Sequence, residues 1–216
     1  MRKLMMLRFV SIMVELVTLT LCADTITIDG YSWPYEIQSN GVSIGGTTSD
    51  GLHWVSATKP QPKGDITIPS MVEGMPVIGI RYSALAYCRG LTSVVIPESI
   101  GTIGQSAFEG CTSLDSVVLP ENLIQISVYA FRNCGLKSIE IPIRCRVFGG
   151  AFENCGKLRK ITSPMNKENY NQLPNSCFPV DAVTNIVISY GTTNIFSSAL
   201  AGFTNLVSLT MPGLTH

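Results

Sequence analysis

The sequence predicts a repeat solenoid of the α/β type, with one parallel β-ladder on one face and a short helical turn in each repeat. A small antiparallel β cap is expected before the first repeat. The main observation is an apolar pattern that recurs with a fixed period through residues 91–158. Prolines mark this period at steps of 23, 22 and 22, at Pro97, Pro120, Pro142 and Pro164. A period in the twenties is typical of solenoids, in which each repeat is too small to bury its apolar face alone and stacks on its neighbours.

Each repeat divides into a strand and a turn. Strand alternation predicts that Val94 and Ile96 point inward and that Val95 points outward. Proline at the end of this stretch has no N–H for a further ladder bond, so it ends the strand. Alanine, phenylalanine and cysteine then follow at i, i+1 and i+4, which suits one face of a single helical turn. We therefore expect the phenylalanines of successive repeats to be buried and stacked, in the order Phe108, Phe131 and Phe152.

The repeat pattern L-x-x-I-x-I-P-x-x-V-x-x-I-G-x-x-A-F-x-x-C resembles the BspA-like branch of leucine-rich repeats. Residues 91–111 follow this pattern throughout, and the resemblance extends over residues 65–212. Proteins of this family are bacterial and protist surface or secreted proteins linked to adhesion and protein–protein contact. The resemblance therefore implies a non-enzymatic protein at the cell surface that binds other proteins and needs no cofactor.

Residues 1–23 have the features of a secretory signal peptide. Arg2 and Lys3 supply positive charge, and an apolar run follows over residues 9–22, although Glu15 interrupts it. We expect the mature chain to be secreted or displayed at the cell surface. A cytosolic leader and a lipoprotein signal are the alternatives. The run is too short and too interrupted for a transmembrane helix, which needs about 20 apolar residues, so no transmembrane span is expected.

Residues 24–64 predict an N-terminal β cap followed by a loop. Apolar residues alternate with polar ones, and the turn dipeptides Asp29-Gly30 and Asn40-Gly41 separate three short strands. The middle strand contains Pro34, which cannot donate to a ladder, so we expect this strand at an edge. The cap would cover the open end of the first repeat.

Residues 65–216 form the predicted solenoid of about six repeats. The fourth repeat is irregular after Pro164, and either Cys177 or Phe178 takes the phenylalanine position. The last repeat is incomplete at His216. Because solenoids need a polar terminal cap, we expect either a longer reading frame or self-association through an uncapped C-terminal end.

The residues that carry chemistry in other proteins favour structural roles here. Four cysteines follow the repeat period, at Cys88, Cys111, Cys134 and Cys155, which predicts a buried column of free thiols, with a disulfide as the alternative. No C-x-x-C pair suggests a metal site. Ser43 lies in a G-x-S-x-G pattern, but the chain has only 2 histidines, so we expect no catalysis. The formal net charge of +0 gives no indication of nucleic-acid binding.

Charge is uneven along the chain. Residues 24–131 contain 10 acids and 4 bases, a net charge of −6, whereas residues 132–216 contain 4 acids and 8 bases, a net charge of +4. The simplest interpretation is a solvated rim, and the alternative is an anion-attracting patch on the third and fourth repeats.

Inward positions are fixed by packing, so partner specificity is expected at outward strand positions. The predicted binding face consists of exposed apolar, hydroxyl and charged residues from successive repeats, namely Val95, Val118, Lys137, Glu140, Arg159, Lys160, Thr162 and Val187. Its three basic residues would orient an acidic protein partner. The leading hypothesis is a secreted or surface protein that mediates protein–protein interaction or adhesion, with a host or neighbouring-cell surface protein as the partner. The alternative is a structural spacer or assembly module without a dedicated ligand.

Overall fold

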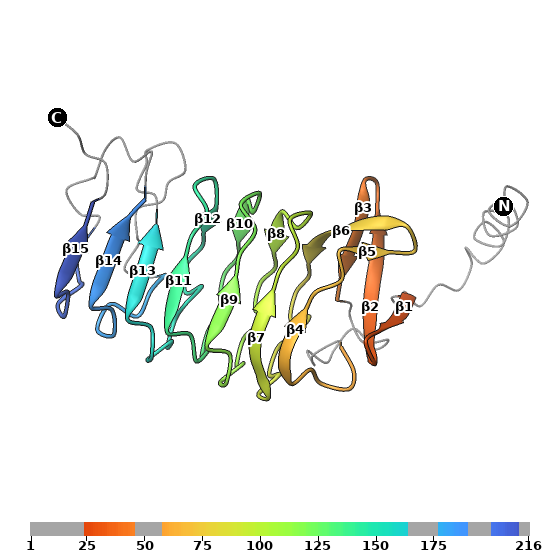
Figure 1. Cartoon of the computed structure of the whole chain (residues 1–216), viewed down its shortest axis with the longest axis horizontal. Coiled ribbons are helices and arrows are strands. Elements are labelled where there is room, and N and C mark those ends of the chain that lie inside the picture. Colours follow the sequence, from red (N-terminus) through yellow and green to blue (C-terminus); the bar gives the residue numbers. More distant parts are fainter. Residues whose placement is uncertain (1–23, 46–57, 164–176, 190–199, 212–216) are drawn as a thin grey trace, which may run out of the picture.

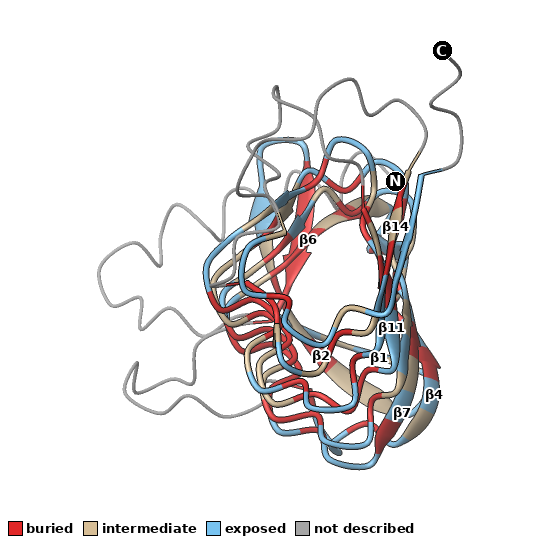
Figure 2. Cartoon of the chain, turned by 90° about the vertical axis from the view of Figure 1, so that its left-hand side faces the viewer, coloured by how far each residue is buried: buried red, intermediate tan, exposed pale blue. Residues whose placement is uncertain are grey.

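The computed structural model describes residues 24–45, 58–163, 177–189 and 200–211 as an elongated stack of coils (Figure 1). The predicted signal segment, the irregular part of the fourth repeat at 164–176, the chain end at 212–216 and both histidines lie outside these residues. Each complete coil has a strand on the front, a shorter strand on a second side and a run of turns on a third. Figure 2, which looks along the stack, shows these sides surrounding a shared interior.

The front of the stack contains two parallel sheets, which we call the front sheets. The first consists of β4 (Gly64–Thr67), β7 (Leu91–Val95) and β9 (Ser116–Val118). The second consists of β11 (Ser138–Glu140), β13 (Lys160–Ser163), β14 (Asn185–Ile188) and β15 (Ser208–Thr210). Val94 and Ile96 are 1% and 3% exposed and Val95 is 43% exposed, which confirms the predicted alternation.

A second parallel ladder runs along the stack, where the sequence predicted a ladder on only one face. It joins β6 (Met75–Ile80), β8 (Thr102–Ile103), β10 (Gln125–Ile126) and β12 (Arg146–Val147). The two-residue strand β5 (Met71–Val72) forms a hairpin with β6. Strands of two residues are too short to show an alternating pattern, so periodicity could not reveal this ladder.

The N-terminal residues form the predicted antiparallel unit of three strands, β1 (Asp24–Ile28), β2 (Tyr31–Gln38) and β3 (Gly41–Ile44). This unit does not stack on the front sheets, because β3 pairs in parallel with β6 and so begins the second ladder. The expectation of an edge position for the proline-containing strand is wrong, since β2 lies between β1 and β3. Pro34 lies just beyond the part of β2 that pairs with β3, and its carbonyl accepts a hydrogen bond from the Gly45 N–H at 2.6 Å.

The third side of each coil is a run of turns, and the described residues contain no helix, so the expected helical turns are not supported. Backbone N–H groups bond three residues back, as from Glu109 to Ser106 at 3.1 Å. In the four coils that contain Cys88, Cys111, Cys134 and Cys155, two positions have left-handed backbone, the residue before the alanine and the residue before the cysteine, namely Ser83, Tyr87, Ser106, Gly110, Tyr129, Asn133, Gly150 and Asn154. A left-handed residue cannot continue a right-handed helix, so each run ends after one turn.

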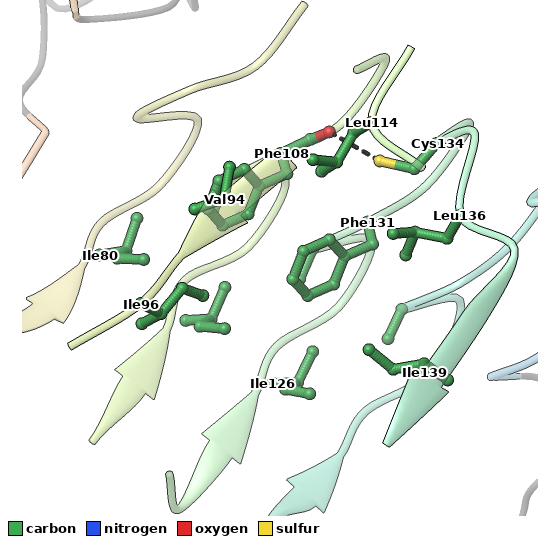
Figure 3. Close-up of a cluster of buried hydrophobic side chains, with 14 of the residues drawn as sticks. Ile80, Val94, Ile96, Phe108, Leu114, Ile126, Phe131, Cys134, Leu136 and Ile139 are labelled. Carbon is green, nitrogen blue, oxygen red and sulfur yellow. Dashed lines mark hydrogen bonds between the residues drawn. The ribbon is translucent and has the colours of Figure 1, made fainter. Parts of the chain in front are cut away.

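The interior contains the predicted stack of phenylalanine rings. The rings of Phe108 and Phe131, both labelled in Figure 3, lie 5.0 Å apart with planes 1° from parallel. Those of Phe131 and Phe152 lie 5.4 Å apart, also with planes 1° from parallel. Phe178 continues the stack 5.0 Å from Phe152. The Cys177 carbonyl accepts from the Phe152 N–H, as the Ala151 carbonyl accepts from Phe131, so Phe178 takes the phenylalanine position of the fourth repeat.

The cysteine column is buried beside this stack. The Sγ atoms of Cys111, Cys134 and Cys155 lie 3.2, 3.1 and 3.0 Å from backbone carbonyl oxygens of the preceding coil (Figure 3 shows the Cys134 contact). Desolvation by burial raises the pKa of Cys155 to about 12. The cysteines of the described residues are buried thiols outside any disulfide, which suits a packing role.

Replacing the ring at the centre of the stack tests the register of the coils. Because Phe131 is fully buried between two parallel rings, Phe131→Ala should lower the free energy of unfolding by about 3–5 kcal/mol, through lost transfer free energy and a cavity. Denaturant unfolding followed by circular dichroism gives this value. Phe148 is 41% exposed and provides the control, since Phe148→Ala should change stability by less than about 1 kcal/mol. Equal effects would contradict the register.

Two tyrosine rings leave room only for glycine at a position of the following coil. The Tyr87 ring covers Gly110, where an added Cβ would lie 2.5 Å from a ring carbon, and the Tyr129 ring covers Gly150 in the same way at 2.3 Å. Both glycines have positive φ. We expect Gly110→Ala to cost about 1–2 kcal/mol from the left-handed backbone alone, with a further loss from the ring contact. Gly101→Ala, whose Cβ would have only ordinary contacts, should be close to neutral in the same unfolding assay.

The ring contribution can be separated from the backbone contribution. Tyr87→Ala introduced into the Gly110→Ala background removes the clash but leaves the positive φ. The double variant should therefore recover part of the lost stability. If the double variant loses as much free energy of unfolding as the two single variants lose together, the ring does not contribute.

Candidate protein-binding face

The predicted face lies on the front sheets, where outward side chains stand in register. In the first sheet Val95 pairs with Val118, and in the second Glu140, Thr162 and Val187 form one row. Lys160 lies in the neighbouring row, between Ser138 and Asn185. Repeat alignment thus identifies positions that are neighbours across the sheets.

The face is interrupted between β9 and β11, where the sequence predicted one continuous column. Cys134 and Leu136 are separated by Gly135 alone, whereas two residues separate Cys111 from Leu114. At Gly135 the shortened corner runs so close to the previous coil that an added Cβ would lie 2.5 Å from the Thr112 carbonyl oxygen. No ladder joins β11 to β9 beyond this corner within the described chain.

The three basic residues of the face differ in their contacts. Lys137 forms an ion pair with Asp115, with Nζ 2.6 Å from Oδ2. The Arg159 guanidinium donates to the carbonyl oxygens of Gly156 at 2.9 Å and Ala182 at 3.1 Å, and so connects two coils. Lys160 is exposed, and no side-chain hydrogen bond or ion pair joins it to the described residues. Of the three, Lys160 is the one whose side chain has no such contact with the described residues.

Sequence reasoning missed the first strand of the face. Asp65 and Thr67 of β4 stand in register with Ser93 and Val95 of β7. The Asp65 carboxylate accepts hydrogen bonds from the hydroxyls of Ser93 and Thr92, both at 2.7 Å. The hydrogen bond from Ser93, and after it the one from Thr92, lowers the pKa of Asp65. The sequence did contain a signal for this strand, because the residues before Pro69 align with the strand residues before Pro97.

The other candidate for chemistry is Ser43. Its side chain is 5% exposed within β3, and its hydroxyl accepts a hydrogen bond from Gln38 Nε2 at 2.8 Å. This position lies in a paired strand and lacks the sharp strand-to-helix turn that exposes a nucleophilic serine. Among the described residues, no group of three histidine, cysteine, aspartate or glutamate side chains could hold a metal ion.

These features define a class of protein, a leucine-rich repeat solenoid whose accessible surface is built from stacked strands. The chain belongs to the BspA type leucine-rich repeat family, whose model matches residues 78–168 and 146–216 with 6 copies of the repeat. Members of this family generally bind other proteins, and their fold is typically non-catalytic. No curated protein matches the chain.

Two solved structures are similar to the fold. A leucine-rich repeat protein from T. pallidum, TpLRR, is 26% identical with a TM-score of 0.60, and the match covers 82% of this chain and 78% of that protein. The pneumococcal vaccine antigen PcpA is 18% identical with a TM-score of 0.59. That match covers 88% of this chain but 42% of PcpA, and it concerns the fold alone. Among the described residues there is no candidate for a membrane-spanning helix.

Two adjacent basic residues should respond differently to the same substitution. Arg159→Ser removes hydrogen bonds to two backbone carbonyls and should lower the free energy of unfolding by about 0.5–1.5 kcal/mol. Lys160→Ser removes an exposed side chain and should stay within about 0.5 kcal/mol of the parent protein. Chemical denaturation of the two variants compares them directly. Equal stabilities would show that the Arg159 contacts do not hold the coils together.

Proposed function

We propose that the chain is a non-enzymatic protein-binding module, secreted or displayed at the cell surface, that mediates protein–protein interaction or adhesion through its front sheets. The observation that carries this proposal is the register of the outward rows. Their side chains stand beside one another across neighbouring strands, and none of them is needed to fill the interior. Such positions can vary without changing the solenoid, which suits recognition.

The composition of the first front sheet supports a protein partner. Val95 and Val118 stand side by side, 43% and 60% exposed, among the hydroxyl side chains of Thr67, Ser93 and Ser116. A flat strip with an apolar centre and a polar surround resembles the composition of protein–protein interfaces. Lys160 on the second sheet would add orientation toward an acidic partner and raise the association rate.

The alternative function is a spacer or assembly module, and one observation favours it. Lys137 and Arg159 are engaged within the solenoid, which leaves the second front sheet with few free charges. Threonine and serine are also ordinary residues of exposed strands. Under this alternative the front sheets would carry no dedicated ligand.

Affinity capture with matched variants distinguishes the two functions. The purified chain is immobilised and exposed to extracellular-matrix proteins and whole-cell extract, and any partner is then measured by surface plasmon resonance. Val95→Glu with Val118→Glu should weaken binding at least tenfold, about 1.4 kcal/mol. Thr102→Glu, an exposed position of β8 on the second ladder, is the control and should leave binding unchanged.

Two outcomes would contradict the proposal. A partner that binds the valine variant and the control equally does not use the front sheets. A hydrolase activity that the purified chain possesses and Ser43→Ala lacks would replace a binding role with catalysis.

A further inference from the structure

The interruption of the front sheets leaves two strand edges facing each other without a ladder, and we call these edges the seam. The Val118 carbonyl accepts from the Ile96 N–H at 3.3 Å, so it points toward β7. The Ile141 N–H donates to the Thr162 carbonyl at 2.8 Å, so it points toward β13. Backbone polar groups of a strand alternate in direction. Those of Val117 and Leu119 therefore face β11, and those of Ser138 and Glu140 face β9, with no ladder bond between them in the described chain.

The seam also exposes part of the core. Val117 and Leu119 occupy inward positions but are only partly buried. Their counterparts on the flanking strands are buried, with exposures of 1% for Val94, 3% for Ile96, 3% for Ile139 and 2% for Ile141. Solvent thus reaches inward side chains at the seam, whereas these flanking positions exclude it.

One end of the seam is closed and the other is open. At the start of the strands the Lys137 N–H donates to the Asp115 carbonyl at 3.2 Å, beside the ion pair of the same residues. Behind the seam the coils stay joined, because the Arg146 N–H donates to the Ile124 carbonyl and the Phe131 N–H to the Ala151 carbonyl, both at 2.8 Å. The opening therefore lies at the carboxyl ends of β9 and β11, on the front only.

The corner around the open end is mainly acidic. Glu121 and Glu140 are exposed beside the ends of the two strands, and Glu98 occupies the same corner one coil earlier. Arg144 is the exposed base on this corner. Three carboxylates against one guanidinium favour a cationic group in the occupant.

We propose that the seam accepts an extended strand from a partner protein, with small apolar residues at alternate positions and a lysine or arginine beside Glu121 and Glu140. The backbone of the strand would pair with the unpaired edges, and its apolar side chains would cover Val117 and Leu119. A strand between two others requires edges about 9.6 Å apart, twice the strand spacing, so the carboxyl ends of β9 and β11 separate while the contacts at the start of the strands and behind them hold. This inference rests on the proposed protein-binding function and names a class of partner.

Synthetic peptides test the seam directly. The probe is the fluorescein-labelled heptapeptide Thr-Val-Thr-Val-Thr-Val-Lys, and a second probe carries the lysine at its amino end to distinguish a parallel from an antiparallel strand. Fluorescence anisotropy should show saturable binding of one probe to the full chain. The same peptide with its central valine replaced by proline loses a backbone donor and should bind at least tenfold more weakly. Absence of saturable binding by either probe, or equal binding of the proline peptide, overturns the proposal.

A change in the chain supplies the matched control. Inserting one serine after Gly135 restores the spacing found between Cys155 and Leu158, so β9 and β11 should form a ladder. Hydrogen exchange should then slow at Val117 and Glu140 relative to the parent chain, and probe binding should fall at least tenfold. Binding that survives in a variant with a closed seam overturns the proposal.

Charge variants keep the test decisive if the insertion prevents folding. Glu121→Gln with Glu140→Gln should weaken the lysine probe about tenfold and leave a norleucine version of it unchanged, whereas Glu98→Gln should have little effect on either. Equal effects on both probes would overturn the assigned position of the basic residue. A protein partner that depends on Val95 and Val118 but not on the seam would leave the proposed function intact and overturn this inference alone.

Discussion

Each coil of this solenoid depends on its neighbours for the partners of its backbone. Hydrogen bonds join successive coils on the front, along the second ladder and on the turn side, as from the Phe108 N–H to the Ala130 carbonyl at 2.8 Å. Equivalent side chains are therefore placed one above another, and the phenylalanine and cysteine columns follow from this stacking. A single coil would leave these groups and its apolar side chains in water.

The same stacking explains what the sequence could predict. Positions such as Val94 and Val95 repeat in every coil, so their alternation and register were readable from the period. The second ladder could not be predicted from the period, because most of its strands have only two residues and show no alternation of apolar and polar positions. The turns were misread because the spacing of Ala107, Phe108 and Cys111 suits a helical turn, while the left-handed residues at Ser106 and Gly110 determine the actual path.

The binding face shows a similar division. Repeat alignment identified Val95, Val118 and Thr162 as outward residues. It could not reveal that Arg159 connects two coils through backbone carbonyls, because that depends on the conformation of a long side chain. Nor could it show that the front ladder stops between β9 and β11, beside the shortened corner at Gly135, because a change of one residue in the period is small in sequence.

The contact of each turn-side tyrosine with the glycine above it makes the order of the repeats matter. Tyr129 occupies a left-handed position and leans over Gly150, so the coil that carries it specifies a residue in the next coil. A tandem duplication of that repeat would bring two tyrosines together at one position, where the second ring has no room. The repeat that carries Tyr129 and the repeat that carries Gly150 are therefore matched to each other and are not interchangeable modules.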